Sequence, residues 1–122
     1  MLGDRKGDKI MLIKIVVDYT DTPGARYYSQ GPYPGEEFRE KILLPKYLEC
    51  YKKNEKLIVD LDGGYGYGSS FLEEAFGGLI RRLKEENMEY KKPVELIEII
   101  SNDEPSWIGK IDKYMKDEIN KK

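Results

Sequence analysis

Apolar runs of the length and composition of strands recur along the chain. Ile10–Val17, Lys56–Asp62 and Pro93–Ile100 are rich in β-branched and aliphatic residues, which predicts three strands. Ala25–Ser29 follows the turn Asp21–Gly24 and is predicted to return as a fourth strand in a hairpin. The pattern indicates an α/β domain with a mixed or parallel sheet of about four strands and helices packed on it.

Between and after these runs, apolar residues recur at the spacing of a helix. Glu36–Lys53 predicts two helical pieces, because Pro45 lacks the N–H that a helix interior needs. The last helix is predicted to begin with Asp103 as its N-cap. The clearest helix begins at Ser69 and Ser70, and its apolar stripe consists of Phe71, Leu72, Ala75, Phe76, Leu79, Ile80 and Leu83. Helical connections between the later strands favour parallel pairing with right-handed crossovers.

Composition indicates one globular domain and excludes several classes of function. The 122 residues fit a single domain, with 36% charged and 39% hydrophobic residues. The 21 basic and 23 acidic residues are interspersed and leave a net charge of −2, which argues against nucleic acid as a partner. The absence of histidine excludes Ser-His-Asp and Cys-His catalysis and most zinc sites. We therefore expect no enzyme activity, no metal and no cofactor.

The single cysteine and the hydropathy pattern bear on the compartment. Cys50 cannot form an internal disulfide, which fits a reducing environment. No apolar run approaches the roughly 20 residues that a transmembrane helix needs, and the charged start differs from a signal peptide. The expected location is the cytoplasm, without a membrane partner. Two starts fit the domain, residues 1–122: Met1, with Met1–Lys9 as a frayed extension, or Met11.

The candidate site is the loop that joins the second apolar run to the clearest helix. In open α/β sheets, binding sites form where the carboxyl ends of strands lead into helix N-termini. Here the glycine-rich loop Gly63–Gly68 connects them. Ser70, with Glu73 three residues later, predicts a capping box, which gives the serine a purely structural role.

An anion at the same helix start is the functional alternative, because free N–H groups and the helix dipole favour negative charge. The anion is either a bound nucleotide phosphate or a phosphate attached to Ser69 or Ser70. The loop has no lysine and no G-x-x-x-x-G-K-[ST] pattern, and Asp62 lies close by, which favours a phosphoserine over a nucleotide. A phosphoserine can switch a protein interface without unfolding the domain.

Further residues around this loop are candidates for contact with a protein partner. Tyr65 and Tyr67 alternate with glycines, so they either point outward as interface anchors or pack into the turn. Asp62 belongs to the same edge of the sheet. Arg26 and Arg39 either meet an acidic partner or a phosphoserine, or form salt bridges with Glu36, Glu37 or Glu40.

Three sequence blocks resemble a family of small, largely uncharacterised bacterial STAS-like proteins. The blocks are the Pro-Gly-x-Arg-Tyr loop at Pro23–Tyr27, the Gly-Glu-Glu-Phe-Arg helix start at Gly35–Arg39, and the V-D-L-D-G…G-Y-G-x-S-F-L-E-E-A-F-G-G-L block at Val59–Leu79. The resemblance spans about Ile10–Ile100. It extends to the STAS domain of sulphate transporters and anti-sigma-factor antagonists.

The resemblance implies a regulatory domain that presents the start of its central helix to a protein partner. In the antagonists, a partner of the histidine-kinase-like ATPase class acts as a serine kinase on a serine at this helix start. By position that serine corresponds to Ser70, with Ser69 beside it. The antagonists carry an Asp-Ser-Ser-Gly pattern, whereas this chain has Gly68 before the serines and Phe71 after them.

Overall fold

The computed structural model describes residues 9–122, so the extension predicted at Met1–Lys9 lies outside the described residues except for Lys9. In chain order the elements are β1 (Ile10–Lys14), α1 (Ile15–Asp18), a 3-10 turn (Tyr28–Gln30), α2 (Gly35–Phe38), a π-helical segment (Arg39–Leu43), α3 (Leu44–Lys53), β2 (Lys56–Asp60), α4 (Ser69–Leu72), a second π-helical segment (Glu73–Gly77), α5 (Gly78–Glu85), α6 (Pro93–Leu96), β3 (Ile97–Ile100) and α7 (Ser106–Asn120).

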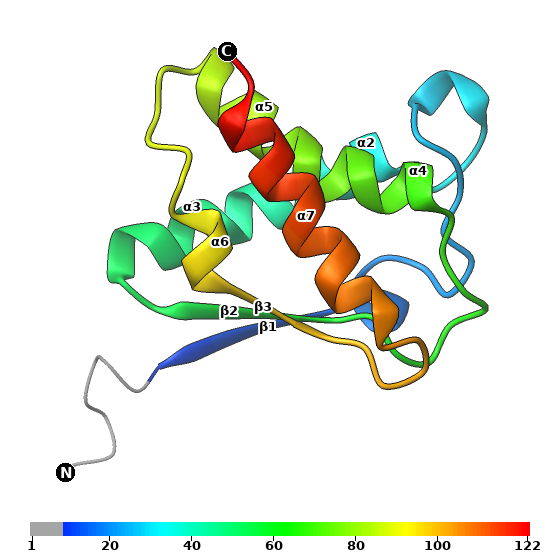
Figure 1. The fold of residues 1–122 in the computed structure, drawn as a ribbon. Helices are drawn as coiled ribbons and strands as arrows, with labels where there is room; N and C mark the ends of the chain where they lie inside the picture. Colours follow the sequence, from blue (N-terminus) through cyan, green and yellow to red (C-terminus); the bar gives the residue numbers. More distant parts are fainter. Residues whose placement is uncertain (1–8) are drawn as a thin grey trace, which may run out of the picture.

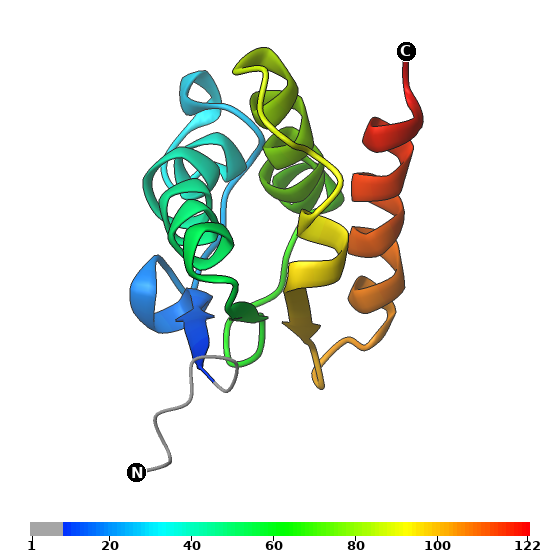
Figure 2. The ribbon, with the colours of Figure 1, turned by 90° about the vertical axis from the view of Figure 1, so that its left-hand side faces the viewer.

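Within residues 9–122 the sheet has three parallel strands in the order β1-β2-β3. Leu12 lies opposite Ile58, which lies opposite Glu98 in the next strand. Figures 1 and 2 show α3, α5 and α7 on the same side of the sheet. The α/β class and the parallel pairing are confirmed, and the strand count is three rather than four.

The predicted fourth strand, Ala25–Ser29, does not form. Its first residue, Ala25, accepts a hydrogen bond from the backbone N–H of Gly35 at 2.9 Å, and its end is a 3-10 turn. The backbone N–H of Tyr28 is bound by the carboxylate of Glu36 at 3.0 Å. The segment therefore pairs these backbone groups with the first residues of α2, which leaves them unavailable for a sheet.

All three strands are shorter than the apolar runs that predict them, and the second ends at Asp60 rather than Asp62. The first run leaves the sheet at Lys14, whose backbone N–H donates to the carboxylate of Asp18 at 2.7 Å as α1 begins. The last run begins with the helical turn α6, and only Ile97–Ile100 pairs in the sheet. Pro93 stands in the first turn of α6, a position where its missing N–H costs nothing.

The core lies between the sheet and the helices. All seven apolar residues predicted for the central helix are buried, as are the helix-facing strand residues Ile13, Leu57 and Val59. The central helix comprises α4, the second π-helical segment and α5, which follow one another without a break. The break predicted near Pro45 does not form: α2, the first π-helical segment and α3 also follow one another without a break, with the proline in the first turn of α3.

Candidate functional site

The loop from β2 to α4 lies at the carboxyl ends of the parallel strands, beside the link from β3 to α7 (Figure 1). The carboxylate of Asp62 accepts hydrogen bonds from the backbone N–H groups of Asn102 and Asp103 at 2.8 and 2.9 Å. The carboxylate of Asp103 accepts one from the backbone N–H of Gly63 at 2.9 Å. The two aspartates therefore link the loop after β2 to the loop after β3 through hydrogen bonds.

This arrangement changes the predicted roles of both aspartates. The backbone N–H of Asp103 and the groups of Asn102 hold the pKa of Asp62 below its ordinary value. Asp62 thus has a structural role in addition to the predicted contact with a partner. Asp103 does not cap α7, whose N-cap residue is Pro105. The Asp103 side chain instead accepts a hydrogen bond from Gly63 in the neighbouring loop. The two loops lie side by side because β2 and β3 are adjacent parallel strands.

The two tyrosines of the loop differ in exposure. Tyr65 is 86% exposed, and its backbone N–H donates to the carbonyl of Asp21 at 3.1 Å. Tyr67 is half-buried, donates its hydroxyl to the carbonyl of Leu61 at 2.9 Å and packs on Phe71 with ring centroids 5.9 Å apart. Burial raises the pKa of Tyr67. Tyr65 therefore has the geometry of an interface anchor, whereas Tyr67 stabilises the loop.

The start of the central helix is exposed at both serines. Gly68 is the N-cap residue, and within residues 9–122 no side chain makes a capping hydrogen bond there. Ser69 and Ser70 are both exposed. The capping box predicted from Ser70 and Glu73 is therefore wrong. The Glu73 carboxylate instead accepts hydrogen bonds from Arg26 and Arg81, because charged guanidinium donors bind a carboxylate more strongly than a backbone N–H does.

Behind the serines, a buried ion-pair cluster joins the two π-helical segments. Arg39 is 7% exposed and donates Nη1 to the Oε2 of Glu74 at 2.6 Å and to the carbonyl of Glu74 at 3.0 Å. Its Nε donates to Glu40 at 2.8 Å, one of the alternatives predicted from sequence. The guanidinium of Arg26 lies within hydrogen-bond distance of both Glu73 and Glu74. Both arginines are thus paired with carboxylates inside the domain. The buried side chain of Arg39 has little exposed surface for contact with another protein.

Further charged residues complete this cluster, and their pairing was not predicted from the sequence. Arg81 donates to Glu73 at 2.9 Å and to Glu118 of α7 at 2.8 Å, and Glu118 is only 5% exposed. Glu73 and Arg81 stand about two helical turns apart, which places them on one face of the helix. This spacing in the sequence could have been used to predict the ion pair between Glu73 and Arg81.

The cluster makes stability depend on pH. Burial acts to raise the pKa of Glu73, but hydrogen bonds from Arg81 and Arg26 outweigh it and hold the pKa below the ordinary 4.5. A carboxyl with a lowered folded pKa stabilises the fold above its unfolded pKa, and this contribution disappears as pH falls through the folded value. We expect the free energy of unfolding from urea titrations to fall below about pH 4.5, and to fall less in Glu73→Gln. An equal loss in both proteins would contradict this role.

Three further exposed tyrosines border the site. Tyr27, Tyr28 and Tyr33 are between 44% and 48% exposed, and all come from the loop before α2. Tyr33 packs edge-on against Tyr19 with ring centroids 5.6 Å apart. The ring of Tyr19 lies 6.4 Å from that of Phe71, which follows the serines directly. The loop before α2 therefore forms a rim beside the start of α4.

The described part of the chain contains neither a candidate metal site nor a membrane-spanning helix. Within residues 9–122 no group of three or more Asp, Glu, Cys or His side chains is arranged to hold a metal ion. Among the helices of the same residues, none combines the length and apolar character needed to cross a membrane.

Comparison with known proteins agrees with the fold and the sequence blocks. No curated protein and no solved structure matches the chain. The profile of the STAS-like domain of unknown function (DUF4325) matches residues 34–107, which is more than half of the 122 residues. The matched region runs from the start of α2 to the start of α7 and includes the glycine-rich loop and both serines. The chain therefore belongs to this STAS-like family.

Proposed function

We propose that the chain is a non-catalytic regulatory domain that binds a protein partner through the surface around Tyr65, Ser69 and Ser70, here called the strand-end face. The exposure of both serines, with no capping role for either within residues 9–122, is the observation that carries the proposal. A serine that caps a helix has a structural explanation, and these serines lack it. The 86% exposed ring of Tyr65 adds an aromatic anchor of the kind that interfaces favour.

We further propose that phosphorylation of Ser70 switches this interaction. A phosphate there lies at a helix N-terminus, where the dipole favours negative charge. Glu73, one turn further along, is paired with two arginines, so its repulsion of a phosphate is reduced. Phe71, which replaces the small residue of the antagonist pattern, is fully buried and does not cover the serines. A kinase of the histidine-kinase-like ATPase class is the proposed modifying partner.

A nucleotide at the same helix start has less support. The cavity next to the loop, lined in part by Tyr67, Asp103 and Trp107, measures about 50 Å³. Small-molecule sites in proteins are typically about 300–1,000 Å³. The acidic side chain of Asp103 also disfavours a phosphate in that cavity. The strand-end face therefore suits a protein surface better than a nucleotide.

Substitution of Ser70 tests the proposal. Ser70→Glu, which adds charge at the helix start, is expected to reduce the capture of the partner about tenfold relative to Ser70→Ala, a difference of about 1.4 kcal/mol. Proteins from the native host that wild type retains are identified by mass spectrometry and quantified on each variant. The melting temperatures of the two variants are expected to lie close together, because neither loses a cap.

The matched control is Ser106→Glu, which places the same charge on an exposed serine at the start of α7. It is expected to capture the partner as wild type does. Equal capture by Ser70→Ala and Ser70→Glu would contradict the switch, and equal capture by Tyr65→Ala and wild type would contradict the binding face.

A further inference from the structure

Strand β1 is an edge of the sheet within residues 9–122. The backbone N–H of Lys14 donates to Asp18 and therefore points away from β2. Backbone groups of successive residues in a strand alternate in direction, so those of Ile10 and Leu12 point away from β2 as well. Among the described residues, β2 is the one strand that pairs with β1. The edge thus offers two residues whose backbone donors and acceptors are available to another strand.

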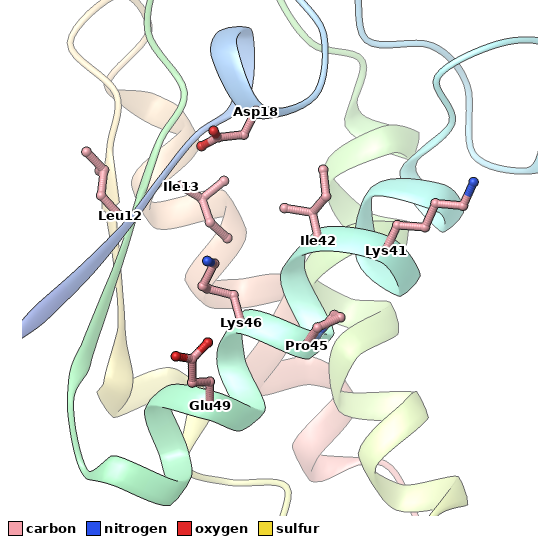
Figure 3. Close-up of a pocket in the computed structure, with 8 residues that line it drawn as sticks. All are labelled: Leu12, Ile13, Asp18, Lys41, Ile42, Pro45, Lys46 and Glu49. Atoms are coloured by element: carbon pink, nitrogen blue, oxygen red, sulfur yellow. The ribbon is translucent and has the colours of Figure 1, made fainter.

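The side chains of these two residues are also exposed. Ile10 is 59% exposed and Leu12 is 56% exposed. Figure 3 shows Leu12 pointing away from α3, and Ile10, two residues earlier in the strand, projects from the same face of the sheet. An apolar edge strand with unpaired backbone groups is a template for pairing with another chain unless charges or turns protect it. Asp18 protects this edge only at Lys14, the last residue of β1.

On the helix side, a groove runs along the same edge, between β1 and the helices Arg39–Leu43 and α3 (Figure 3). Its volume is about 330 Å³. Figure 3 shows Ile13 and Ile42 turned toward each other across it, with Lys46 and Glu49 pointing from α3 toward the strand. Its charged lining residues are Asp18, Lys41, Lys46 and Glu49. The groove is the space that side chains of an additional strand beside β1 would occupy.

We propose that this edge binds a second copy of the chain, with β1 antiparallel to β1 of that copy. The two-fold axis passes beside Met11 and is perpendicular to the sheet. Ile10 of each copy then lies opposite Leu12 of the other, and both pairs exchange backbone hydrogen bonds. The result is one continuous sheet with three strands from each copy. This inference is independent of the proposed function of the strand-end face.

Apolar complementarity and the position of Asp18 select this register. On the helix-free face, the two cross-strand pairs are Ile10 with Leu12, which cover each other's exposed apolar surface. A register centred on Leu12 would instead place Ile10 opposite Lys14, whose N–H is already bound by Asp18. Pairing centred on Met11 stops before Lys14 and leaves that hydrogen bond intact.

Charge complementarity favours a second copy over an unrelated strand. The groove carries two lysines and two carboxylates, so its charge is balanced. The two-fold axis makes the two α3 helices antiparallel. The Lys46 end of one groove therefore faces the Glu49 end of the other. An isologous interface requires this pairing of a basic residue in one copy with an acidic residue in the other, because the same surface has to complement itself.

Disulfide trapping tests the register. Two Met11 residues that face each other in a non-hydrogen-bonded pair have Cα atoms about 4.5 Å apart, within the range of a disulfide. Met11→Cys is expected to form a covalent dimer under mild oxidation, whereas Lys113→Cys, a highly exposed position on α7, is not. Native Cys50 is fully buried and does not compete. Equal cross-linking at both positions, or none at Met11→Cys, overturns the proposal.

The oligomeric state tests the interface itself. Wild type is expected to sediment as a dimer at high concentration, and Leu12→Lys as a monomer with an unchanged circular dichroism spectrum. The matched control Val17→Lys replaces an apolar residue that is 72% exposed but lies outside β1, and it is expected to remain dimeric. A monomeric wild type overturns the proposal, as does a Leu12→Lys dimer. Species larger than a dimer do so too, since pairing of β1 with β3 of another copy would propagate without closing.

Discussion

Replacing Arg39 with methionine is expected to lower the free energy of unfolding by about 3 kcal/mol, the size of effect seen when one partner of a buried ion pair is removed. Both side chains of the pair, Arg39 and Glu74, are about nine-tenths buried. Methionine fills much of the volume but donates no hydrogen bond. The Oε2 atom of Glu74 and its carbonyl both lose the donor that Arg39 supplies. Urea unfolding followed by circular dichroism measures the loss.

Two further variants separate the ion pair from general packing. The double variant Arg39→Met/Glu74→Leu is expected to recover part of the lost stability, because it removes the buried carboxylate whose Oε2 atom the single variant leaves without its Arg39 donor. Arg82→Met removes a more exposed guanidinium, which pairs with Glu40 and Glu86, and is expected to cost less than about 1 kcal/mol. If Arg39→Met costs no more than Arg82→Met, the buried pair does not stabilise the fold.

Helices and strands could be predicted where the pattern of hydrophobic residues along the chain determines them. The 3.6-residue stripe of the central helix identified all seven of its buried apolar residues, because each faces the same core. The strands around Leu12, Ile58 and Ile99 were predicted from short runs of aliphatic and β-branched residues. Their ends were misplaced where a later residue, such as Asp18, satisfies the backbone and starts a turn.

The candidate site was predicted less completely, because distant residues decide its hydrogen bonds. A capping box at Ser70 needs a free Glu73, and the guanidinium that removes Glu73 comes from Arg26, 47 residues earlier. Likewise, Asp62 and Asp103 were assigned separate local roles, although the parallel order of their strands places them at one edge. That proximity could have been inferred from the predicted topology, whereas the Arg26 contact could not.

The departure of this chain from the antagonist pattern, Phe71 after the serines, has a stabilising effect that can be measured. Phe71 is fully buried directly after the two serines, and its ring lies 5.9 Å from the ring of Phe38 in α2 and 5.9 Å from that of Tyr67. Phe71→Ala is therefore expected to lower the free energy of unfolding by about 4 kcal/mol, as for other buried phenylalanines.

Phe71→Gly restores the Ser-Ser-Gly order of the antagonists and is expected to cost about 1 kcal/mol more than Phe71→Ala, because glycine disfavours a helix. Tyr65→Ala, which removes a ring that is 86% exposed, is the matched control and is expected to change stability by less than about 0.5 kcal/mol. Thermal and urea unfolding of the three variants measure these changes in the free energy of unfolding. If Phe71→Ala is as stable as Tyr65→Ala, the ring does not anchor the helix start. If it is destabilised as expected, this chain holds its exposed serines in place with an aromatic core residue where the antagonists have glycine.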